Sequence, residues 1–183
     1  MLTNAGMDQA WTSDPGPVLI SKSEIAARVE SLADEISRDY QGQSIKVGVV
    51  LAGAIVFAAD LVRQISLDVE IFFIQASSYG DGTVSSGQVQ VRRDEKVELA
   101  DTHVLVVDDI LDTGYTARAL LDDLGSQRPA SLRMATLLDK PSRRQVDVQV
   151  DYVGFEVPNK FVVGYGMDHS GSFRHLPSVH ALD

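Results

Sequence analysis

Two kinds of hydrophobic pattern alternate along the chain. From residue 22 onward, apolar side chains recur every three or four positions, at Ile25, Val29, Leu32, Ala33 and Ile36. This spacing is typical of one face of an amphipathic helix. Ser21 and Glu24 have the three-residue separation of a capping box, which satisfies the first free N–H groups of a helix. The pattern therefore predicts a helix over roughly residues 22–40.

Uninterrupted apolar runs form the second kind of pattern and predict buried strands. The first run, KVGVVLAG, covers residues 46–53, and residues 54–65 then return to helical spacing. A helix is also expected over residues 116–125, with Gly125 where a C-terminal stop belongs. Further strands are expected over residues 69–80, 103–109, 131–140, 151–158 and 160–166.

Strands that alternate with helices predict an α/β fold, with a doubly wound and mostly parallel sheet covered on both faces. In such sheets, ligands bind beyond the carboxyl ends of the strands. The chemistry is therefore expected just after Leu51, Ala76, Val107 and Leu138. Unusual segments follow these four positions, namely AGA, SSYGDGTVSSG, DDILDTGYT and DKPSRR.

The longest of the expected loops covers residues 77–96. It is rich in Ser and Gly at its start and charged at its end. A long loop of this kind is typical of a mobile lid over an active site, and equally of a plain surface hairpin. Both interpretations remain open from the pattern alone.

Length and composition fit one globular domain. The chain has 183 residues, of which 44% are hydrophobic and 23% charged, and a single domain is expected over residues 17–183. Residues 1–16 lack the basic start and apolar centre of a secretory signal, and a disordered leader is expected there. The longest uncharged stretch, Val47 to Ala59, is well short of the roughly 20 apolar residues that a membrane span needs. No membrane partner is expected.

Charge and residue types exclude several other classes of function. With 16 Lys and Arg against 26 Asp and Glu, the formal net charge is -10, which opposes binding to a nucleic acid backbone. No Cys is present, so disulfides, thiolate metal sites and Cys nucleophiles are unavailable, a composition that suits the cytoplasm. The four His form no i, i+4 zinc pair. Mg²⁺ is the only metal that we expect, and no P-loop string occurs.

One segment, VLVVDDILDTGYT at residues 104–116, combines two opposite demands. Thr113, Gly114 and Thr116 open a helix whose free N–H groups attract a phosphate. The acidic residues Asp108, Asp109 and Asp112 crowd the same turn, and like charges about 5 Å apart repel by roughly 3 kcal/mol. A sugar diol and Mg²⁺ would offset that repulsion. A phosphorylated sugar therefore suits the turn better than does the alternative, a solvated turn with aspartates favoured by the helix dipole.

This segment resembles the signature with which type I phosphoribosyltransferases bind PRPP, 5-phosphoribosyl 1-pyrophosphate. SSYG, LLDKPSRR, DYVGFEVPNKFVVGYGMD and FRHLP resemble segments of the hypoxanthine-guanine phosphoribosyltransferases, in the same order, from about Pro17 to about Pro177. The resemblance implies the type I phosphoribosyltransferase fold, with a small hood region and a flexible lid loop. It implies purine salvage: a 6-oxopurine displaces pyrophosphate from PRPP to form IMP or GMP. It also implies a homo-oligomer, a dimer or a tetramer.

By this resemblance, different residues of the acidic turn would bind different parts of the substrates. Asp108 and Asp109 would hold the ribose hydroxyls, directly or through Mg²⁺, and Asp112 would face the purine N7 as proton acceptor or hydrogen-bond partner. The 5′-phosphate would lie against the backbone and side chains of Thr113, Gly114, Tyr115 and Thr116. The two apolar residues inside the signature, Ile110 and Leu111, belong to the same binding segment.

The resemblance assigns roles elsewhere along the chain as well. Lys140 would donate to the purine 6-oxo group, Phe161 would stack on the base, and the backbone of Val162 would contact its edge. Asp168 would bind a second Mg²⁺ at the pyrophosphate, and Arg174 would contact the pyrophosphate itself. The pyrophosphate loop, in which relatives have a non-proline cis peptide, would consist of Leu51, Ala52 and Gly53. The lid would begin with Ser78 and Tyr79.

Four residues depart from the family pattern. Many relatives have Lys at the position of Ala52, Glu at that of Asp108, Lys at that of Tyr115 and Tyr at that of His169. Ala52 keeps the backbone amides that would contact pyrophosphate, but it removes any contact that the lysine makes to another subunit. Asp108 shortens the carboxylate by one methylene, so its contact to the diol is expected through metal or water.

Three alternatives were weighed against this interpretation. VLVVDD also opens receiver domains of response regulators, but there the acids lie near the start of the domain and roughly a hundred residues follow. A PRPP-sensing regulator of the same fold that binds nucleic acid would need a basic face. Within the enzyme class, the alternative is a xanthine-guanine phosphoribosyltransferase.

Overall fold

A computed structural model describes residues 14–78 and 89–182 of the chain. Its centre is a six-stranded sheet in the order β4-β3-β2-β5-β6-β7. Neighbouring strands run parallel except β3 and β4, which are antiparallel. The expected α/β fold with a mostly parallel sheet is confirmed. The strands are β2 (Ser44–Leu51), β3 (Asp68–Ser78), β4 (Val89–Arg93), β5 (His103–Leu111), β6 (Ser131–Asp139) and β7 (Tyr152–Glu156).

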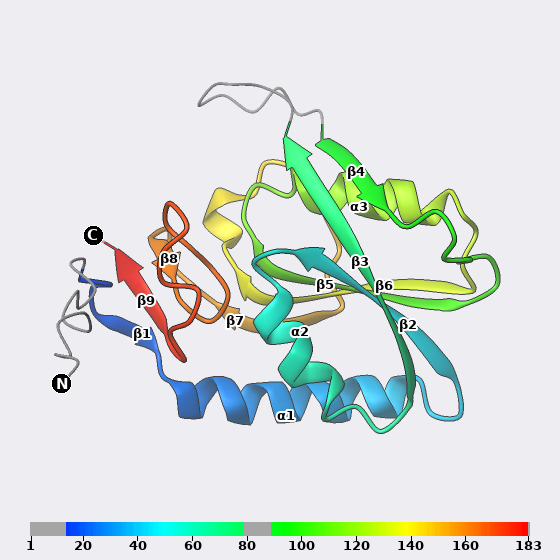
Figure 1. Ribbon diagram of the computed structural model, residues 1–183, viewed down its shortest axis with the longest axis horizontal. Coiled ribbons are helices and arrows are strands. Elements are labelled where there is room, and N and C mark those ends of the chain that lie inside the picture. The colour runs from blue at the N-terminus through cyan, green and yellow to red at the C-terminus, as the bar shows by residue number, and fades with distance from the viewer. Residues whose placement is uncertain (1–13, 79–88, 183) are drawn as a thin grey trace, which may run out of the picture.

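Helices cover both faces of this sheet (Figure 1). On one face, α1 (Lys22–Asp39) and α2 (Ile55–Val62) share an apolar core with Val47, Val49 and Leu105 of the sheet. On the other face, α3 (Tyr115–Gly125) packs with alternate residues of the same strands, such as Val104 and Val106. Because both faces of β5 are buried, its sequence is a continuous apolar run rather than an alternating one.

The N-terminal helix is held at its start and along its side. Ser21 caps α1: its backbone N–H donates to Glu24 Oε2 at 2.9 Å and its Oγ accepts from the Glu24 N–H at 3.3 Å, which confirms the predicted capping box. Further along, the Arg28 guanidinium donates to the backbone oxygens of Val153 at 2.6 Å and Gly154 at 3.0 Å. The helix is thereby fixed to β7, the edge strand of the sheet.

A second, three-stranded antiparallel sheet forms the small hood. Its order is β1-β9-β8, with β1 (Val18–Ile20), β8 (Phe161–Val163) and β9 (Val179–Leu182). The two ends of the chain therefore pair with each other and with β8. A short 3₁₀ helix, η1 (Pro141–Arg143), follows β6.

Several boundaries differ from the sequence-based expectation. The pattern did not predict β1, β4 or β9, and β5 continues beyond its predicted end at Asp109 to Leu111. Gly125 is the last residue of α3 rather than the residue after it. The described flanks of residues 77–96 pair as antiparallel strands β3 and β4, an arrangement that both a lid and a plain surface hairpin would have. The rest of that loop, with Tyr79, and residues 1–13 of the expected leader lie outside the described residues. Within the described ranges, no helix is long and apolar enough to cross a membrane.

Candidate active site

A cavity of about 270 Å³ lies at the carboxyl end of β5, where the acidic turn was expected to bind a phosphorylated sugar. It is lined by residues 108–114 together with Val50, Ala76, Thr116 and Ala117. Parallel strands bring their carboxyl ends to one sheet edge, so side chains from β2, β3 and β5 meet in this cavity.

Gly114 forms the turn between β5 and α3. Its φ of +93° is in the left-handed region, and a Cβ built there would lie 2.6 Å from the Val146 carbonyl oxygen. The Gln145 and Val146 N–H groups donate to the Thr113 carbonyl oxygen at 2.9 and 3.0 Å, which holds the turn against this segment. As N-cap residue of α3, Gly114 has no side-chain oxygen to cap the first turn. The helix start is therefore available to an anion that enters the cavity.

Asp108 and Asp109 are neighbouring carboxylates, of which Asp108 is buried and Asp109 is partly buried. The Asp109 N–H donates to Asp108 Oδ1 at 3.0 Å, and the Ile110 N–H donates to Asp109 Oδ1 at 3.0 Å. Burial raises the pKa of Asp108 well above its ordinary value, and the neighbouring Asp109 charge adds to this rise. Burial also raises the pKa of Asp109, while hydrogen bonds and the charge of Arg174 oppose that rise. The pair is thus suited to groups that donate hydrogen bonds or carry positive charge.

The same pair fits Mg²⁺ by donor chemistry, because hard oxygen ligands are those that this ion prefers. Among the described residues, no three acidic or histidine side chains stand close enough to hold a metal ion by themselves. Mg²⁺ is commonly bound by one or two carboxylates that share it with substrate phosphates. The arrangement therefore fits a metal ion that arrives with its substrate.

Asp112 and Lys140 lie on the side of the turn that leads to the hood. The Arg143 Nε donates to Asp112 Oδ1 at 3.1 Å. Lys140 is 6% exposed, and its Nζ donates to the Lys160 carbonyl oxygen at 2.6 Å. Burial lowers the pKa of Lys140, which the charge of Asp112 opposes and that of Arg143 reinforces. A donor and an acceptor are thereby placed near one another beside the first residue of β8.

That first residue, Phe161, is 54% exposed, which is unusual for a large aromatic side chain. Its ring meets the His169 ring edge to face, with centroids 5.3 Å apart and an interplanar angle of 87°. Val162, in contrast, is buried and pairs with Ala181 of β9. An exposed ring next to a fixed backbone strand offers a planar ligand a stacking surface.

Asp168 and Arg174 bind each other in the segment that follows β8. Arg174 Nη2 lies 2.6 Å from Asp168 Oδ1, and the Gly171 N–H donates to Asp168 Oδ2 at 2.7 Å. Arg174 Nη1 also donates to the Gly166 carbonyl oxygen at 2.7 Å. The charge of Arg174 partly offsets the rise in the pKa of Asp109, the carboxylate that lies against Gly53.

The predicted pyrophosphate loop connects β2 to α2 and contacts both neighbouring parts of the site. The Leu51–Ala52 peptide bond is cis, as the family resemblance implied. A Cβ built on Gly53 would lie 1.8 Å from Asp109 Oδ2, so the carboxylate rests directly against the Gly53 backbone. A Cβ built on Gly166 would lie 2.1 Å from the Gly53 carbonyl oxygen. The loop is thus enclosed between the β5 carboxylates and the segment after β8.

Most of the predicted site residues of the acidic turn line one cavity, and the Gly53 backbone lies against Asp109. Lys140 contacts the residue before β8, while Phe161 and Arg174 line two neighbouring cavities of their own. For Ser78 only the backbone at the end of β3 is described, and Tyr79 lies outside the described residues. The sequence analysis missed Arg143, which binds Asp112, and Gly166, which packs on the pyrophosphate loop. Arg143 belongs to the SRR string after Lys140, and that basic pair was the available signal.

Comparisons with known proteins agree with this geometry. The family described as phosphoribosyl transferase domain matches residues 20–170. The hypoxanthine phosphoribosyltransferase of Haemophilus influenzae is 48% identical over 87% of this chain and 90% of its own. The hypoxanthine-guanine phosphoribosyltransferase of Streptococcus pneumoniae is 42% identical over 93% and 94%. A crystal structure of the Bacillus anthracis hypoxanthine-guanine phosphoribosyltransferase, with HEPES in its active site, superposes with a TM-score of 0.88 at 44% identity, covering 93% of this chain and all of the other. The chain belongs to the phosphoribosyltransferase family.

Proposed function

We propose that the chain is a purine salvage enzyme, a hypoxanthine-guanine phosphoribosyltransferase that transfers the 5-phosphoribosyl group of PRPP to hypoxanthine or guanine. The products are IMP or GMP and pyrophosphate. One observation carries the proposal: a free helix start and the neighbouring carboxylates of Asp108 and Asp109 share the cavity at the end of β5. Only a ligand that combines a phosphate with hydroxyls or a metal ion satisfies both halves of that cavity.

Each part of PRPP has a partner in this arrangement. The 5′-phosphate binds the N–H groups at the start of α3 and the hydroxyls of Thr113 and Thr116. Asp108 and Asp109 accept hydrogen bonds from the ribose hydroxyls. The backbone N–H groups of the pyrophosphate loop and the Arg174 guanidinium bind the leaving group. Asp108 and Asp109 would hold one Mg²⁺ beside the ribose, and Asp168 would hold a second at the pyrophosphate; these ions would neutralise charge on the leaving group.

The purine binds between Phe161 and the Asp112 side of the turn. Lys140, held by the Lys160 carbonyl oxygen, is placed to donate to the 6-oxo group. Asp112 accepts a hydrogen bond or a proton at N7 while the ring nitrogen attacks C1′. Arg143 occupies Oδ1 of Asp112, which leaves Oδ2 for the base. A 6-amino group would meet the Lys140 donor with a donor of its own, so adenine should be a poor substrate.

A base panel tests this proposal. The purified chain is incubated with PRPP and Mg²⁺ and with each of hypoxanthine, guanine, xanthine and adenine in turn. IMP and GMP should form quickly and AMP hardly at all. The reaction with xanthine distinguishes the proposed enzyme from a xanthine-guanine phosphoribosyltransferase, because the latter would form XMP faster than IMP. Formation of no nucleotide with any of the four bases would overturn the proposal.

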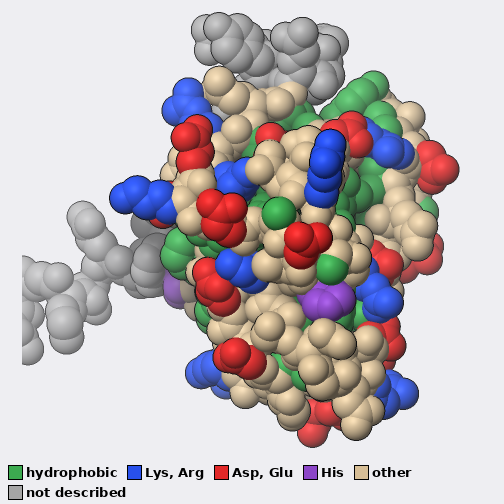
Figure 2. Space-filling view, turned by 90° about the vertical axis from the view of Figure 1, so that its right-hand side faces the viewer, with side chains coloured by type: hydrophobic (Ala, Val, Ile, Leu, Met, Phe, Trp, Pro, Cys, Tyr) green, Lys and Arg blue, Asp and Glu red, His purple; other side chains and the backbone are tan. Residues whose placement is uncertain are grey.

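A PRPP-sensing regulator that binds nucleic acid is the second candidate, and the surface charge argues against it. Figure 2 shows one face of the molecule, on which Lys and Arg side chains are interspersed with Asp and Glu. This face has no continuous basic area among the described residues, in keeping with the net charge of -10. The enzyme should therefore elute from heparin at low salt, whereas a nucleic acid binder would be retained.

The proposal includes a cytoplasmic homo-oligomer, a dimer or a tetramer. Ile71 and Phe73 of β3 are large apolar side chains that are 47% and 53% exposed, on the same side of the strand. Exposed apolar neighbours of this size favour burial against another surface. Light scattering coupled to size exclusion should give a mass of two or four chains, and a monomer would contradict this part of the proposal.

A further inference from the structure

The two segments proposed to hold pyrophosphate meet where neither has a side chain. Gly53 belongs to the pyrophosphate loop, and Gly166 belongs to the 164–176 loop, which contains Asp168 and Arg174. The space that a Cβ on Gly166 would need is filled by the Gly53 carbonyl oxygen, at 2.1 Å, and by Val56 Cβ, at 3.5 Å. A contact made only by backbone and van der Waals surfaces fixes a distance, but it does little to prevent sliding. Something else has to hold the two segments in register.

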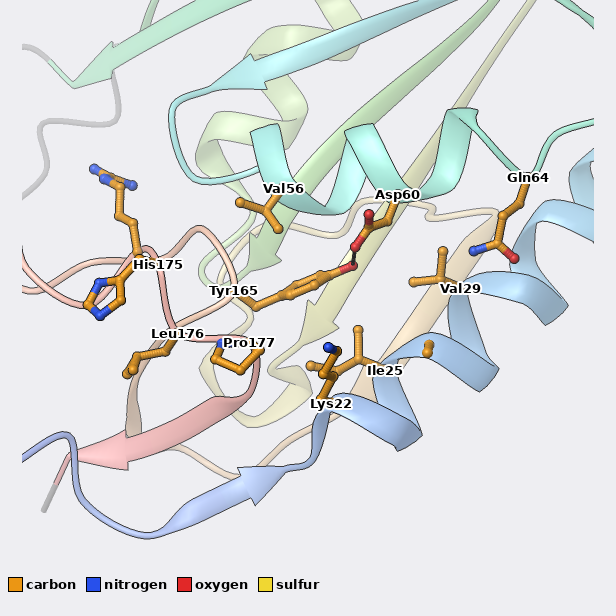
Figure 3. A pocket seen from close by; sticks show the side chains of 12 residues that line it. Lys22, Ile25, Val29, Val56, Asp60, Gln64, Tyr165, His175, Leu176 and Pro177 are labelled. Carbon is orange, nitrogen blue, oxygen red and sulfur yellow. Dashed lines mark hydrogen bonds between the residues drawn. The ribbon is translucent and has the colours of Figure 1, made fainter.

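The residue next to this contact supplies a polar connection. Tyr165 donates from its hydroxyl to Asp60 Oδ2 of α2 at 2.7 Å, across 105 residues of sequence. Figure 3 shows the Tyr165 ring lying beneath α2, with its hydroxyl directed at Asp60 and with Val56 on the same side of the helix. The ring closes one side of a cavity of about 430 Å³, to which α1 contributes Ile25 and Val29. Tyr165 is 5% exposed.

The backbone conformation of Tyr165 indicates that its side chain contributes to stability. Its φ is +49°, in the left-handed region, where a residue with a Cβ costs about 1–2 kcal/mol more than glycine. Glycine would relieve that strain, so the contacts of the ring and hydroxyl have to exceed it. Burial and the bond to Asp60 raise the pKa of Tyr165, which keeps the hydroxyl protonated and able to donate.

Movement at Tyr165 would be passed on to Asp168 and Arg174, because the 164–176 loop is tied across its base. The Tyr165 N–H donates to the Leu176 carbonyl oxygen at 2.8 Å, and the Gly166 N–H donates to the Arg174 carbonyl oxygen at 2.9 Å. The Arg174 side chain in turn binds both the Gly166 carbonyl oxygen and Asp168. The loop therefore moves as a unit with the residue at its base.

We propose that Tyr165 and Asp60 are a positioning pair, which holds the 164–176 loop in register with the pyrophosphate loop and thereby sets the affinity for PRPP and pyrophosphate. Neither residue touches the substrate in this proposal. Asp60 acts through α2, which begins two residues after the pyrophosphate loop, and Tyr165 acts through Gly166. The inference rests on the proposed function, because it assigns pyrophosphate to these two loops.

The test uses Tyr165→Phe, which removes only the hydroxyl, and a matched control elsewhere in the fold. Tyr152 is equally buried, at 4% exposure, and its hydroxyl donates to Asp39 Oδ2 at 2.8 Å. It stands at the start of β7, at the opposite end of the sheet from the site. The same hydroxyl accepts from Arg133 Nη1 at 2.6 Å, so Tyr152→Phe removes a hydrogen bond to aspartate and one from arginine without touching either loop. Steady-state kinetics with hypoxanthine, calorimetry with pyrophosphate and Mg²⁺, and melting curves are measured for both variants.

For Tyr165→Phe, we expect KM for PRPP and Kd for pyrophosphate to rise about tenfold, the effect of losing one hydrogen bond to a charged group. KM for hypoxanthine should rise less than KM for PRPP, because the loop contains both proposed pyrophosphate residues but contacts the proposed purine site through the ring of His169 against Phe161. Tyr152→Phe should lower Tm about as much as Tyr165→Phe does. It should leave KM for PRPP and Kd for pyrophosphate unchanged. Asp60→Asn, which keeps an acceptor for the hydroxyl, should bind PRPP as the wild type does. Asp60→Ala should reproduce the effect of Tyr165→Phe, and the double variant should be no worse than either alone.

Two results would contradict the proposal that Tyr165 and Asp60 position the loop. The first is a Tyr165→Phe variant that loses stability as Tyr152→Phe does and keeps its KM for PRPP, which would make the hydroxyl a purely structural group. The second is an Asp60→Ala variant with unchanged affinity for PRPP. Failure of the proposed function looks different, because then the wild-type chain itself would form no IMP.

Discussion

Substitution of Gly53 by Ala tests how closely the pyrophosphate loop is fitted to the carboxylates of β5. The new Cβ would lie 1.8 Å from Asp109 Oδ2 and 2.5 Å from its Cγ. Gly53 is not among the glycines with a positive φ, so the conformation itself accepts alanine. The three nearest atoms to the new Cβ all belong to Asp109, so this carboxylate has to give way.

The size of the effect follows from that distance. To reach an ordinary contact of 3.4 Å, the carboxylate has to withdraw by about 1.6 Å. Asp109 is partly buried and its Oδ1 accepts from the Ile110 N–H at 3.0 Å, so such a shift breaks a hydrogen bond to a partly desolvated charge. Overpacking of this kind costs about 1–3 kcal/mol. For a chain of this length, we expect Tm to fall by roughly 4–8 °C for a loss of about 2 kcal/mol.

Melting curves and PRPP kinetics of Gly53→Ala measure this effect, with Gly125→Ala as the control. A Cβ on Gly125 meets only Leu132 Cδ2, at 3.8 Å, so that variant should be as stable as the wild type or slightly more so. The double variant Gly53→Ala/Asp109→Ala lacks the carboxylate that the new Cβ would meet. Adding Asp109→Ala to Gly53→Ala should therefore restore part of the lost stability but should not restore PRPP binding. The reasoning is refuted if Gly53→Ala keeps both its Tm and its KM for PRPP.

Three further predictions concern the acids and the lysine. Asp112→Asn should lower kcat by about 10²-fold, the usual contribution of a general base, while PRPP with Mg²⁺ still protects the variant against melting; unchanged turnover would remove Asp112 from its role. Because burial raises the folded-state pKa of Asp108 above its unfolded value, ionisation of this carboxyl removes stability as the pH rises through the folded pKa. In buffer without Mg²⁺, Asp108→Asn should therefore melt above the wild type at pH 8, and this gap should close toward about pH 4; a gap independent of pH contradicts the assignment. Lys140→Met should reduce the ratio of kcat/KM for hypoxanthine to that for adenine by about tenfold to a hundredfold, as expected for one lost hydrogen bond from a charged donor, and an unchanged ratio would exclude Lys140 from base recognition.

Most of the central sheet was predictable because its signals are local. Burial on both faces makes β2, β5 and β6 continuous apolar runs, and the amphipathic spacing of α1 with its capping box marks that helix from its first turn. The order of strands and helices then places the site at one sheet edge before any contact is known. This is why the acidic turn could be assigned to a phosphorylated sugar.

The hood and its contacts were less predictable because they depend on partners distant in sequence. β1 and β9 are short, and they form strands by pairing with each other and, for β9, with β8. Arg143 binds Asp112 across 31 residues, and Tyr165 binds Asp60 across 105. No local pattern marks such pairs, since each side chain alone is compatible with an ordinary surface or core position.

Acidic residues can crowd the proposed phosphate site because the backbone and the side chains would bind different parts of the ligand. The start of α3 and the pyrophosphate loop present N–H groups, which bind anions without any basic residue. The acids at the same sheet edge are then free to serve the hydroxyls and the metal, at the cost of a raised pKa for Asp108 and Asp109 when no ligand is present. No cluster of three ligands within the described residues can hold the metal alone, so in the proposed function Mg²⁺ and PRPP would bind together, each supplying contacts that the other lacks. The burial that destabilises the free carboxylates would then favour this combination over either ligand alone.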